Sequence, residues 1–317
     1  MGHRGIAVTL TAVAALVVGL LGPGSGPARA DVLPVAYDFF SGIPAELTNP
    51  GGSLPGSNDF GCEPSARHPN PVILMHGTGG SQQTNWGTYA PLLANEGYCV
   101  FAPTYGAIPG LPWPFTAVGG MGLMTDSARQ FGAFVDAVLR ATGAERVDVV
   151  GHSQGTIVPA YYAKYLGGQD KIENYVSLAP AWRGTTLAGT DVILPLVRRL
   201  GIPADRIPLC QACAELDPDS PFLQKVREGG YYLPTIRYTN IGTRYDELVV
   251  PYWASMPPGG ANVRNIVVQD GCPSDYTEHA GIAGSRRAAH FVLNALDPGN
   301  PRPVPCDRAA PLSGSPF

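Results

Sequence analysis

A serine stands at the centre of the pattern GHSQG, which spans residues 151–155. An apolar run over 146–150 precedes the pattern and helical spacing over 157–166 follows it, so a sharp turn from a buried strand into a helix is predicted. Glycine on both sides of such a turn lets the strand and helix backbones approach without a Cβ clash. The turn exposes the hydroxyl of Ser153 as a nucleophile at the end of a sheet; the simpler interpretation is a glycine-rich turn with a solvent-facing serine.

A serine nucleophile needs a general base, because its hydroxyl reacts poorly at neutral pH. Where a nucleophile sits in this kind of turn, the chain order is serine, acid, histidine. Only two histidines follow Ser153, namely His279 and His290. His290 falls inside a predicted helix, where a packed or helix-terminal histidine is expected. His279 lies in a loop and is followed by a small residue and a glycine, so we predict that it is the base.

The acid that orients the histidine should follow the strand predicted over 235–241. Asp246 stands in the loop after that strand and is the predicted acid, which holds the imidazole tautomer and stabilises the imidazolium. Its neighbour Glu247 is a weaker candidate. Asp270 and Asp275 lie too close to the histidine in sequence to come from a separate strand end, and we interpret them as solvated loop charges.

An oxyanion formed at the substrate needs two backbone N–H donors. One is predicted at Gln154, directly after the nucleophile. The other is predicted at Thr78, within the turn HGTGG over 76–80 that follows the apolar run 71–76. The alternative is that these glycines only form a turn. No lysine follows at the spacing of a phosphate-binding loop, so this pattern is weak evidence for a nucleotide site.

The elements that position these residues alternate along the chain. Apolar runs predict strands over 71–76, 98–102, 146–150, 172–178, 235–241 and 263–268, and helical spacing predicts helices over 86–95, 126–139, 157–166 and 286–296. Short links between alternating strands and helices predict one α/β domain over 31–317, with a mostly parallel central sheet covered by helices on both faces. Residues 31–70 are predicted to be irregular. Residues 179–234 interrupt the alternation and are predicted to form a cap or lid above the strand ends.

The first thirty residues are predicted to be a signal peptide that is cleaved after Ala30. A short basic start, an apolar run over 6–21 and an A-x-A end are typical of secretory signals. The alternative is a membrane anchor, but this run is shorter than the roughly 20 residues that span a bilayer. We therefore expect a secreted, extracellular protein without a stable membrane anchor. The formal net charge of −4 argues against a nucleic-acid partner, which favours a basic face.

Six cysteines follow the predicted cleavage site, and an even count in an exported chain predicts disulfides. Six cysteines allow 15 pairings, so the sequence alone leaves the pattern open. Cys210 and Cys213 are close enough for a small local disulfide. We favour this over half of a zinc site, because zinc needs four ligands and no second close pair of cysteine or histidine is near.

With these residues, the chain resembles the secreted α/β-hydrolase triacylglycerol lipases of actinobacteria and is similar to the fungal (Candida antarctica) lipase B type. The resemblance covers residues from about Cys62 to Cys306. The motifs that carry it are HGTGG with Asn85 and Trp86, GYC over 97–99, GHSQG, GTTLAG over 184–189, DELV over 246–249, and Cys272 followed by EHAG over 278–281.

The resemblance implies the catalytic residues Ser153, Asp246 and His279, and the oxyanion donors Thr78 and Gln154. It also implies the disulfides Cys62–Cys99 and Cys272–Cys306, which leaves Cys210 to pair with Cys213. Two features depart from the lipase B type, namely the histidine that precedes the nucleophile and the stretch around Cys210. Both bear on the size and mobility of any lid.

The function expected from the sequence is a secreted serine carboxylester hydrolase, specifically a triacylglycerol lipase, which needs no cofactor or metal. We expect a monomer that acts on lipid or ester substrates, also at an oil–water interface. A short-chain esterase, a polyester depolymerase and an acyltransferase are alternatives on the same three residues. A non-catalytic secreted binding protein is an alternative from another class. The apolar stretches 108–115 and 191–197 are interpreted as acyl-site walls or as ordinary core.

Overall fold

The computed structural model describes residues 1–2, 32–185 and 210–317. The predicted signal peptide therefore lies outside the described residues, except for its first two. Residues Leu33–Phe317 form one compact unit. None of the helices in the described part of the chain combines the length and the apolar character needed to span a bilayer.

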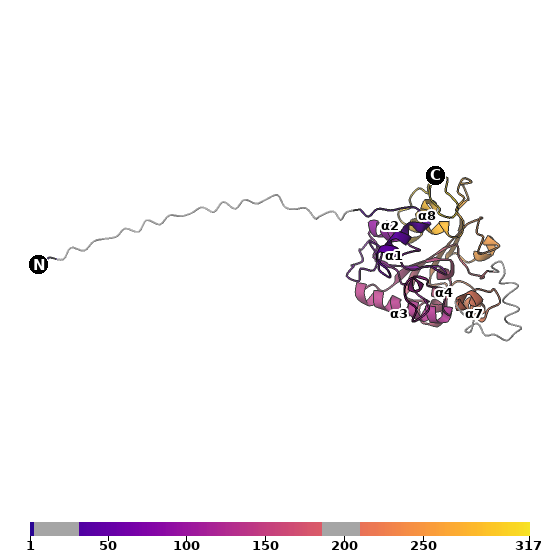
Figure 1. Cartoon of the computed structure of the whole chain (residues 1–317), viewed down its shortest axis with the longest axis horizontal. Coiled ribbons are helices and arrows are strands. Elements are labelled where there is room, and N and C mark those ends of the chain that lie inside the picture. Colours follow the sequence, from indigo (N-terminus) through magenta and orange to yellow (C-terminus); the bar gives the residue numbers. More distant parts are fainter. Residues whose placement is uncertain (3–31, 186–209) are drawn as a thin grey trace. The chain divides into compact units, whose positions relative to one another are not determined.

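A sheet of six parallel strands forms the centre of this unit (Figure 1). The strands are β1 (Val72–Met75), β2 (Val100–Phe101), β3 (Val147–His152), β4 (Ile172–Leu178), β5 (Arg237–Gly242) and β6 (Val263–Val267), in the order β2-β1-β3-β4-β5-β6. The predicted mostly parallel sheet is confirmed. Because all carboxyl ends of parallel strands lie at one edge, the loops that follow β1, β3, β5 and β6 meet there.

Helices cover both faces of the sheet. The α-helices are α1 (Ile43–Thr48), α2 (Tyr89–Asn95), α3 (Met124–Thr142), α4 (Val158–Tyr165), α6 (Gln211–Glu215), α7 (Pro221–Arg227) and α8 (Arg286–Leu296). Short 3₁₀ turns are η1 (Phe39–Gly42), η2 (Phe115–Ala117), η3 (Ser153–Thr156), η5 (Tyr252–Ser255) and η6 (Gly281–Ala283).

Strand β1 shows why both faces need cover, since its buried side chains alternate between two apolar layers. Ile73 and Met75 belong to the layer that α3 and α4 complete, whereas Val72 and Leu74 belong to the layer that α2 and α8 complete. The two helix pairs lie on opposite sides of the sheet in Figure 1. Alternate side chains of a strand point to opposite faces, so a fully apolar run predicts a strand buried on both.

Two predicted segments need comment. Residues 31–70 are more regular than predicted, and the predicted cap over 179–234 lies partly outside the described residues. Residues 31–70 were predicted to be irregular, but they contain η1 and α1, with Asp38 capping the first turn and Pro44 starting the second. These helices are only 4 and 6 residues long, too short to show a periodic pattern. Within the predicted cap, α6 and α7 are present, whereas residues 186–209 lie outside the described residues, together with the predicted wall 191–197.

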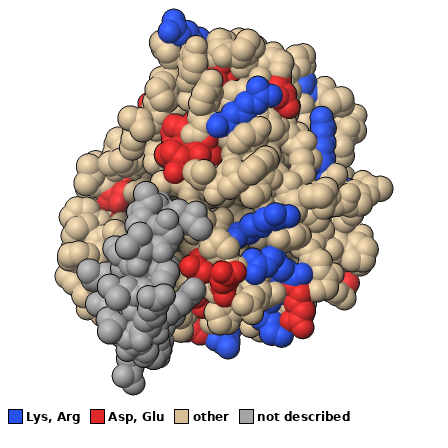
Figure 2. All heavy atoms as spheres, turned by 90° about the vertical axis from the view of Figure 1, so that its right-hand side faces the viewer, with Lys and Arg blue, Asp and Glu red and all other residues tan. Residues whose placement is uncertain are grey.

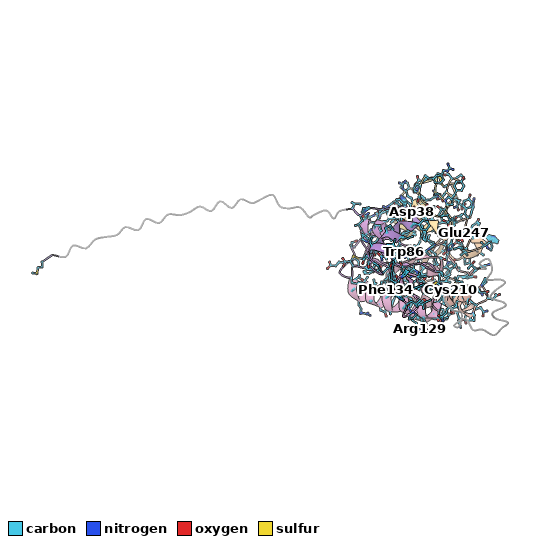
Figure 3. All side chains as sticks on the ribbon, viewed as in Figure 1. Asp38, Trp86, Arg129, Phe134, Cys210 and Glu247 are labelled. Carbon is cyan, nitrogen blue, oxygen red and sulfur yellow. A yellow bond between two sulfur atoms is a disulfide. The ribbon has the colours of Figure 1, made fainter. Side chains whose placement is uncertain are left out.

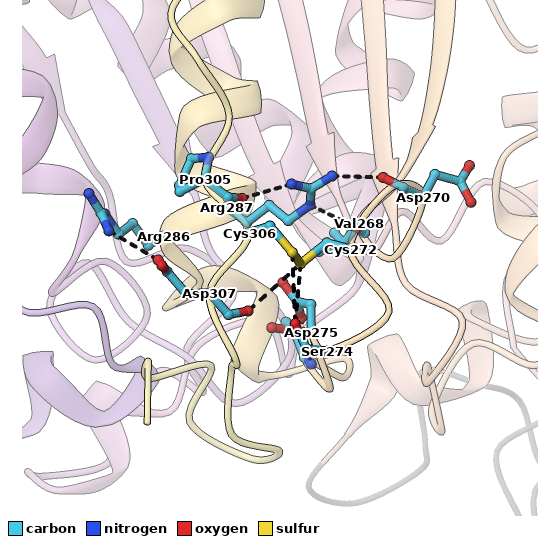
Figure 4. The surroundings of a disulfide bond; sticks show 11 residues. Val268, Asp270, Cys272, Ser274, Asp275, Arg286, Arg287, Pro305, Cys306 and Asp307 are labelled. Carbon is cyan, nitrogen blue, oxygen red and sulfur yellow. Dashed lines mark hydrogen bonds and ion pairs between the residues drawn. A yellow bond between two sulfur atoms is a disulfide. The ribbon is translucent and has the colours of Figure 1, made fainter.

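All six cysteines are paired, as Cys62–Cys99, Cys210–Cys213 and Cys272–Cys306. These are the three pairs that the resemblance and the local spacing imply. The pair Cys272–Cys306 ties the segment after β6 to the C-terminal segment (Figure 4). Beside it, the buried Arg287 of α8 donates hydrogen bonds to the carbonyl oxygens of Val268, Asp270 and Pro305, each at 2.7 Å. The loop that carries His279 therefore begins from a braced position.

Candidate active site

Ser153 lies at the carboxyl end of β3, where the chain turns into η3 and α4. Its φ is 53°, in the left-handed region that a residue with a side chain seldom occupies. A Cβ on Gly151 would lie 2.3 Å from the carbonyl oxygen of Gly155, and a Cβ on Gly155 would lie 2.0 Å from that of Met75. Only glycine fits at either position, so the pattern forces the turn that exposes the serine.

Three side chains that are distant in sequence form one hydrogen-bonded chain at this edge of the sheet. His279 Nε2 lies 2.8 Å from Ser153 Oγ, and His279 Nδ1 lies 2.8 and 2.9 Å from the two carboxylate oxygens of Asp246. A carboxylate only accepts hydrogen bonds, so the imidazole proton belongs on Nδ1 and Nε2 accepts from the serine hydroxyl. The structure thus brings together the three residues predicted as nucleophile, acid and base.

Asp246 and His279 are both buried, and main-chain groups orient them. Asp246 Oδ1 accepts hydrogen bonds from the backbone N–H groups of Leu248 at 3.1 Å and Val249 at 2.7 Å. Glu247, the weaker candidate for the acid, accepts instead from the backbone N–H of His279 at 3.3 Å. Burial raises the pKa of the Glu247 carboxyl. Of the two neighbouring carboxylates, one therefore contacts the imidazole ring and the other contacts its main chain.

The remaining candidate acids and bases have partners other than Ser153. Asp270 is an exposed loop charge, as predicted, and it pairs with Arg244. The prediction for Asp275 is wrong, because this residue is fully buried and accepts the backbone N–H of Thr277 at 2.8 Å. A bridge to Ala309 covers it, and such a contact with the C-terminal segment leaves no local sequence pattern. His290 lies on α8 with its Nδ1 2.8 Å from the carbonyl oxygen of Pro303.

The turn after β1 runs directly against the nucleophile. A Cβ on Gly77 would lie 3.1 Å from Ser153 Cβ, so this glycine brings the turn close and Thr78 follows at once. The side chain of Gln154 donates to the carbonyl oxygen of Gly120 at 3.0 Å, and a Cβ on Gly120 would lie 3.2 Å from Thr78 Cα. The two predicted oxyanion residues therefore lie next to the nucleophile and share a neighbour.

His152, which precedes the nucleophile, has a role that the sequence did not reveal. Its Nε2 lies 2.8 Å from the carbonyl oxygen of His279 and its Nδ1 lies 3.0 Å from Asn85 Oδ1. Asn85 Oδ1 accepts the backbone N–H of Gly77 at 3.1 Å. Burial, with the nearby His279 as a second cause, lowers the pKa of His152 to about 3, so the ring is neutral and its single N–H donates to one of these two oxygens at a time. It lies between the loop of His279 and the loop of Thr78, and neither of its ring nitrogens contacts Ser153.

A cavity of about 570 Å³ opens above Ser153. Its described lining is mainly apolar and includes Phe39, Phe40, Ile43, Leu47, Trp113, Pro114, Ala117, Val118, Leu216, Leu248 and Val249. The predicted wall 108–115 supplies two of these residues. Sequence reasoning missed the wall formed by η1 and α1, because 31–70 lacks a clear periodic pattern. In Figure 3, Asp38, which caps η1, lies at the same end of the molecule as Glu247.

The arrangement of charged groups bears on what a metal ion requires and, on one face, on the charge of the surface. Among residues 32–185 and 210–317, no group of three or more His, Cys, Asp or Glu is arranged to hold a metal ion. On the face drawn in Figure 2, basic and acidic side chains are interspersed over a largely uncharged surface.

Solved structures of lipases share this fold. Lipase B of Aspergillus fumigatus superimposes with a TM-score of 0.56 at 17% identity, over 80% of this chain and 56% of that one. The mature lipase BlEst2 of Bacillus licheniformis gives a TM-score of 0.51 at 14% identity, over 78% of this chain and 96% of that one. At such identities the similarity establishes an α/β-hydrolase fold.

Comparisons of the sequence identify the family of this chain, whereas the solved structures identify only its fold. A curated relative, the pyrrolizixenacetamide deacetylase of Xenorhabdus hominickii, is 34% identical over 92 residues, which are 27% of this chain and 29% of that protein. The match thus spans less than a third of the relative's length. Residues 69–284, more than half of the chain, match the profile of the family described as lipase (class 2), and this range contains the nucleophile turn and the loops of Asp246 and His279. The chain therefore belongs to the class 2 lipase family.

Proposed function

We propose that this protein is a secreted serine carboxylester hydrolase, specifically a triacylglycerol lipase. The observation that carries the proposal is the hydrogen-bonded chain from Ser153 through His279 to Asp246 at the base of an apolar cavity. Membership of a lipase family supports hydrolysis, and the geometry supports these residues as its agents.

In the proposed mechanism, the Ser153 hydroxyl attacks the ester carbonyl while His279 Nε2 takes its proton. Asp246 keeps the imidazole in the required tautomer and stabilises the imidazolium. The backbone N–H groups of Thr78 and Gln154 hold the oxyanion of the tetrahedral intermediate. His279 then protonates the leaving alcohol, and a water molecule repeats the sequence on the acyl-enzyme, releasing the acid.

A lipid substrate is supported by the side chains around the cavity. Phe40, Leu47 and Trp113 line it and are 47%, 61% and 42% exposed. Val250 and Trp253, which follow the lining residues Leu248 and Val249, are 55% and 56% exposed. Large exposed apolar side chains that gather in one region favour contact with an apolar surface. We infer that acyl chains enter here, also from an oil–water interface.

Export with removal of residues 1–30 belongs to the proposal, as does action as a monomer. Three disulfides support an oxidising compartment, because such bonds are rare in reducing ones. Export is tested by N-terminal sequencing of the protein recovered from the medium of an expressing host. A first residue at Asp31 is expected, and retention of residues 1–30 on a membrane would contradict it.

The hydrolase proposal is tested with p-nitrophenyl esters of short and long acyl chains and with emulsified triacylglycerol. We expect hydrolysis of long-chain esters, and a rise in rate when the triacylglycerol concentration exceeds its solubility. Ser153→Ala should abolish turnover and labelling by a fluorophosphonate probe while leaving thermal unfolding unchanged. Full turnover by the alanine variant would show that the serine assignment is wrong.

The same assays separate the alternatives. Activity confined to soluble short-chain esters indicates an esterase, release of monomers from a polyester film indicates a depolymerase, and ester formation with an added alcohol in water indicates an acyltransferase. Absence of both turnover and probe labelling in the unmodified protein indicates a binding protein. An N-acetyl amide is included in the substrate panel, because the curated relative is named as a deacetylase.

A further inference from the structure

Glu46 of α1 is a buried carboxylate in the wall of an otherwise apolar cavity. It is 4% exposed and is the one acidic side chain among the described residues that line the cavity. Removing a carboxylate from water is costly unless hydrogen bonds replace the solvent. The groups that bind it therefore indicate what the carboxylate does.

Four uncharged donors bind the two oxygens of Glu46. Oε1 accepts from the backbone N–H of Gly51 at 2.9 Å and from the indole N–H of Trp113 at 3.3 Å. Oε2 accepts from the amide of Gln83 at 2.9 Å and from the hydroxyl of Ser81 at 3.2 Å. Each oxygen thus takes two hydrogen bonds, so the carboxylate is saturated by the protein and acts on its neighbours rather than on a substrate.

These donors belong to different walls of the site. Ser81 and Gln83 lie in the oxyanion loop, which we define as residues 77–85 and which carries Thr78. Trp113 lies in the apolar wall that precedes η2. One carboxylate therefore joins three segments. They are the N-terminal wall, which we define as η1 and α1 over residues 39–48, the oxyanion loop, and the Trp113 wall, which we define as residues 108–115.

The oxyanion loop transmits this anchor toward the nucleophile. Ser81 Oγ, which donates to Glu46, accepts the backbone N–H of Thr84 at 3.1 Å. Asn85 follows, and its Oδ1 accepts the backbone N–H of Gly77, the residue that packs against Ser153. Glu46 is thus connected to Gly77, the residue beside Thr78, through the hydrogen bonds of Ser81 and Asn85 and the peptide bond between Thr84 and Asn85.

Backbone packing makes this coupling stiff. A Cβ on Gly42 would lie 1.9 Å from the carbonyl oxygen of Gln83, and a Cβ on Gly87 would lie 2.3 Å from the backbone nitrogen of Gly42. The N-terminal wall and the chain around the oxyanion loop are therefore in direct backbone contact, and a shift of α1 displaces the loop.

We propose that Glu46 is a positioning residue that sets the oxyanion loop against Ser153 and holds the indole of Trp113 in the acyl wall. This inference rests on the proposed hydrolase function. Glu46 has two separable effects. Its contact with Ser81 and Gln83 acts on transition-state stabilisation, and its contact with Trp113 acts on binding of long acyl chains.

The main test is Glu46→Gln, which keeps the side-chain volume but turns one acceptor oxygen into a donor that faces other donors. With a short-chain p-nitrophenyl ester we expect kcat to fall about tenfold or more with little change in KM, since loss of a full oxyanion donor costs about 10² to 10³ in kcat. Inhibition by an alkyl boronic acid, which forms a tetrahedral adduct with the serine, should weaken in parallel. The matched control Glu63→Gln, at an exposed position, should behave as the unmodified protein.

Two variants divide the contacts and carry the test if Glu46→Gln does not fold. Ser81→Ala should lower kcat for short and long esters alike. Trp113→Phe, which removes only the indole N–H donor and part of the ring, should act on KM rather than on kcat and should raise KM more for the long ester than for the short one. The proposal is overturned if both variants match the unmodified protein, or if both give the same change in kcat and KM.

Failure of this inference is distinguishable from failure of the proposed function. If Ser153→Ala is inactive while folded Glu46→Gln keeps full kcat and full boronic-acid affinity, only the role of Glu46 is wrong. If the unmodified protein hydrolyses no ester and is not labelled by the fluorophosphonate probe, the hydrolase proposal itself is wrong. If Ser153→Ala keeps its activity, the serine assignment is wrong. In both cases the role of Glu46 falls with it.

Discussion

The two ends of strand β3 carry polar groups of opposite character. Near its amino end, Asp148 is 3% exposed and its Oδ1 accepts from the backbone and side-chain N–H groups of Asn174, both at 2.9 Å, and from Asn70 at 3.3 Å. At its carboxyl end, Ser153 faces His279 and an open cavity. The acceptor oxygen of Asp148 is occupied by protein donors, whereas the hydroxyl of Ser153 lies at an open cavity, where the proposed substrate would bind.

The difference follows from the direction of the strands. Asp148 is held by residues of the neighbouring strand β4 and of the segment before β1. Burial raises the pKa of its carboxyl to about 7, although the hydrogen bonds from Asn174 and Asn70 lower it. The groups around Ser153 come from loops after β1, β5 and β6, which parallel strands place at one edge. Loops can be rearranged without disturbing the sheet, and this is why we place the proposed chemistry at the carboxyl edge.

The largest effect on activity is expected from Asp246→Asn. The amide keeps an oxygen for the N–H groups of Leu248 and Val249 but favours the wrong imidazole tautomer, so kcat should fall about 10⁴-fold. Steady-state kinetics with a short ester measures this, and thermal unfolding should stay within a few degrees. A loss of less than tenfold would show that Asp246 does not act with His279 and Ser153 as a catalytic triad.

Gly77→Ala should have the next largest effect. The new Cβ would meet Ser153 Cβ at 3.1 Å and His152 Nδ1 at 3.2 Å, which pushes the oxyanion loop from the nucleophile. We expect kcat to fall about 100-fold, in the range for a lost oxyanion donor. Gly299→Ala is the control, because its Cβ would meet no atom closer than 3.8 Å. Equal activities of the two variants would argue against an oxyanion role for this loop.

A smaller loss is expected from Glu247→Gln. Its carboxylate contacts the main chain of His279 and not the ring, so an amide oxygen can replace it at a cost of about threefold in kcat. The comparison with Asp246→Asn decides which of the two neighbouring carboxylates is the acid. Equal losses in both variants would leave that assignment without support.

Asp148→Asn should leave activity within about twofold and change stability instead. Burial raises the pKa of Asp148 from 3.8 to about 7 in the folded state, so its stabilising contribution is present below pH 4 and is lost as the pH rises through about 7. The amide stays neutral, and the variant should gain on the order of 1–3 kcal/mol over the unmodified protein at pH 8. Urea unfolding at pH 4, 6 and 8 measures the gain, and an equal difference at all three values would contradict the raised pKa.

A feature of this protein could be predicted from the sequence when the interactions that cause it lie between residues close together in the chain. The turn at Ser153 was predictable, since two glycines at fixed spacing meet backbone atoms that any such turn brings together. Helix α8 was predicted with its observed bounds, because its apolar spacing is regular and Ser285 caps its start. Strand β2 has 2 residues, fewer than the five predicted over 98–102, because only Val100 and Phe101 pair in the sheet.

The roles of Glu46, His152 and Asp275 were not predictable from local patterns. The side-chain partners of Glu46 lie 35, 37 and 67 positions away along the chain, and Glu46 itself lies in the segment 31–70, which lacks periodic spacing. His152 stands beside the nucleophile, but the carbonyl that it contacts is 127 positions away. Asp275 is covered by the C-terminal segment. Each depends on contacts between distant segments, and a single sequence carries no direct record of these.

The sequence by itself determined how strands and helices alternate along the chain, the sharp turn at Ser153 and the parallel direction of the sheet. Backbone sterics and apolar periodicity act over a few neighbouring residues, so the sequence displays them directly. Only the tertiary structure decided that η1 and α1 wall the cavity, that Asp246 rather than Glu247 meets the imidazole ring, and that Glu46 is buried among three segments. These outcomes depend on packing between loops and the termini, whose geometry arises only once the sheet has assembled.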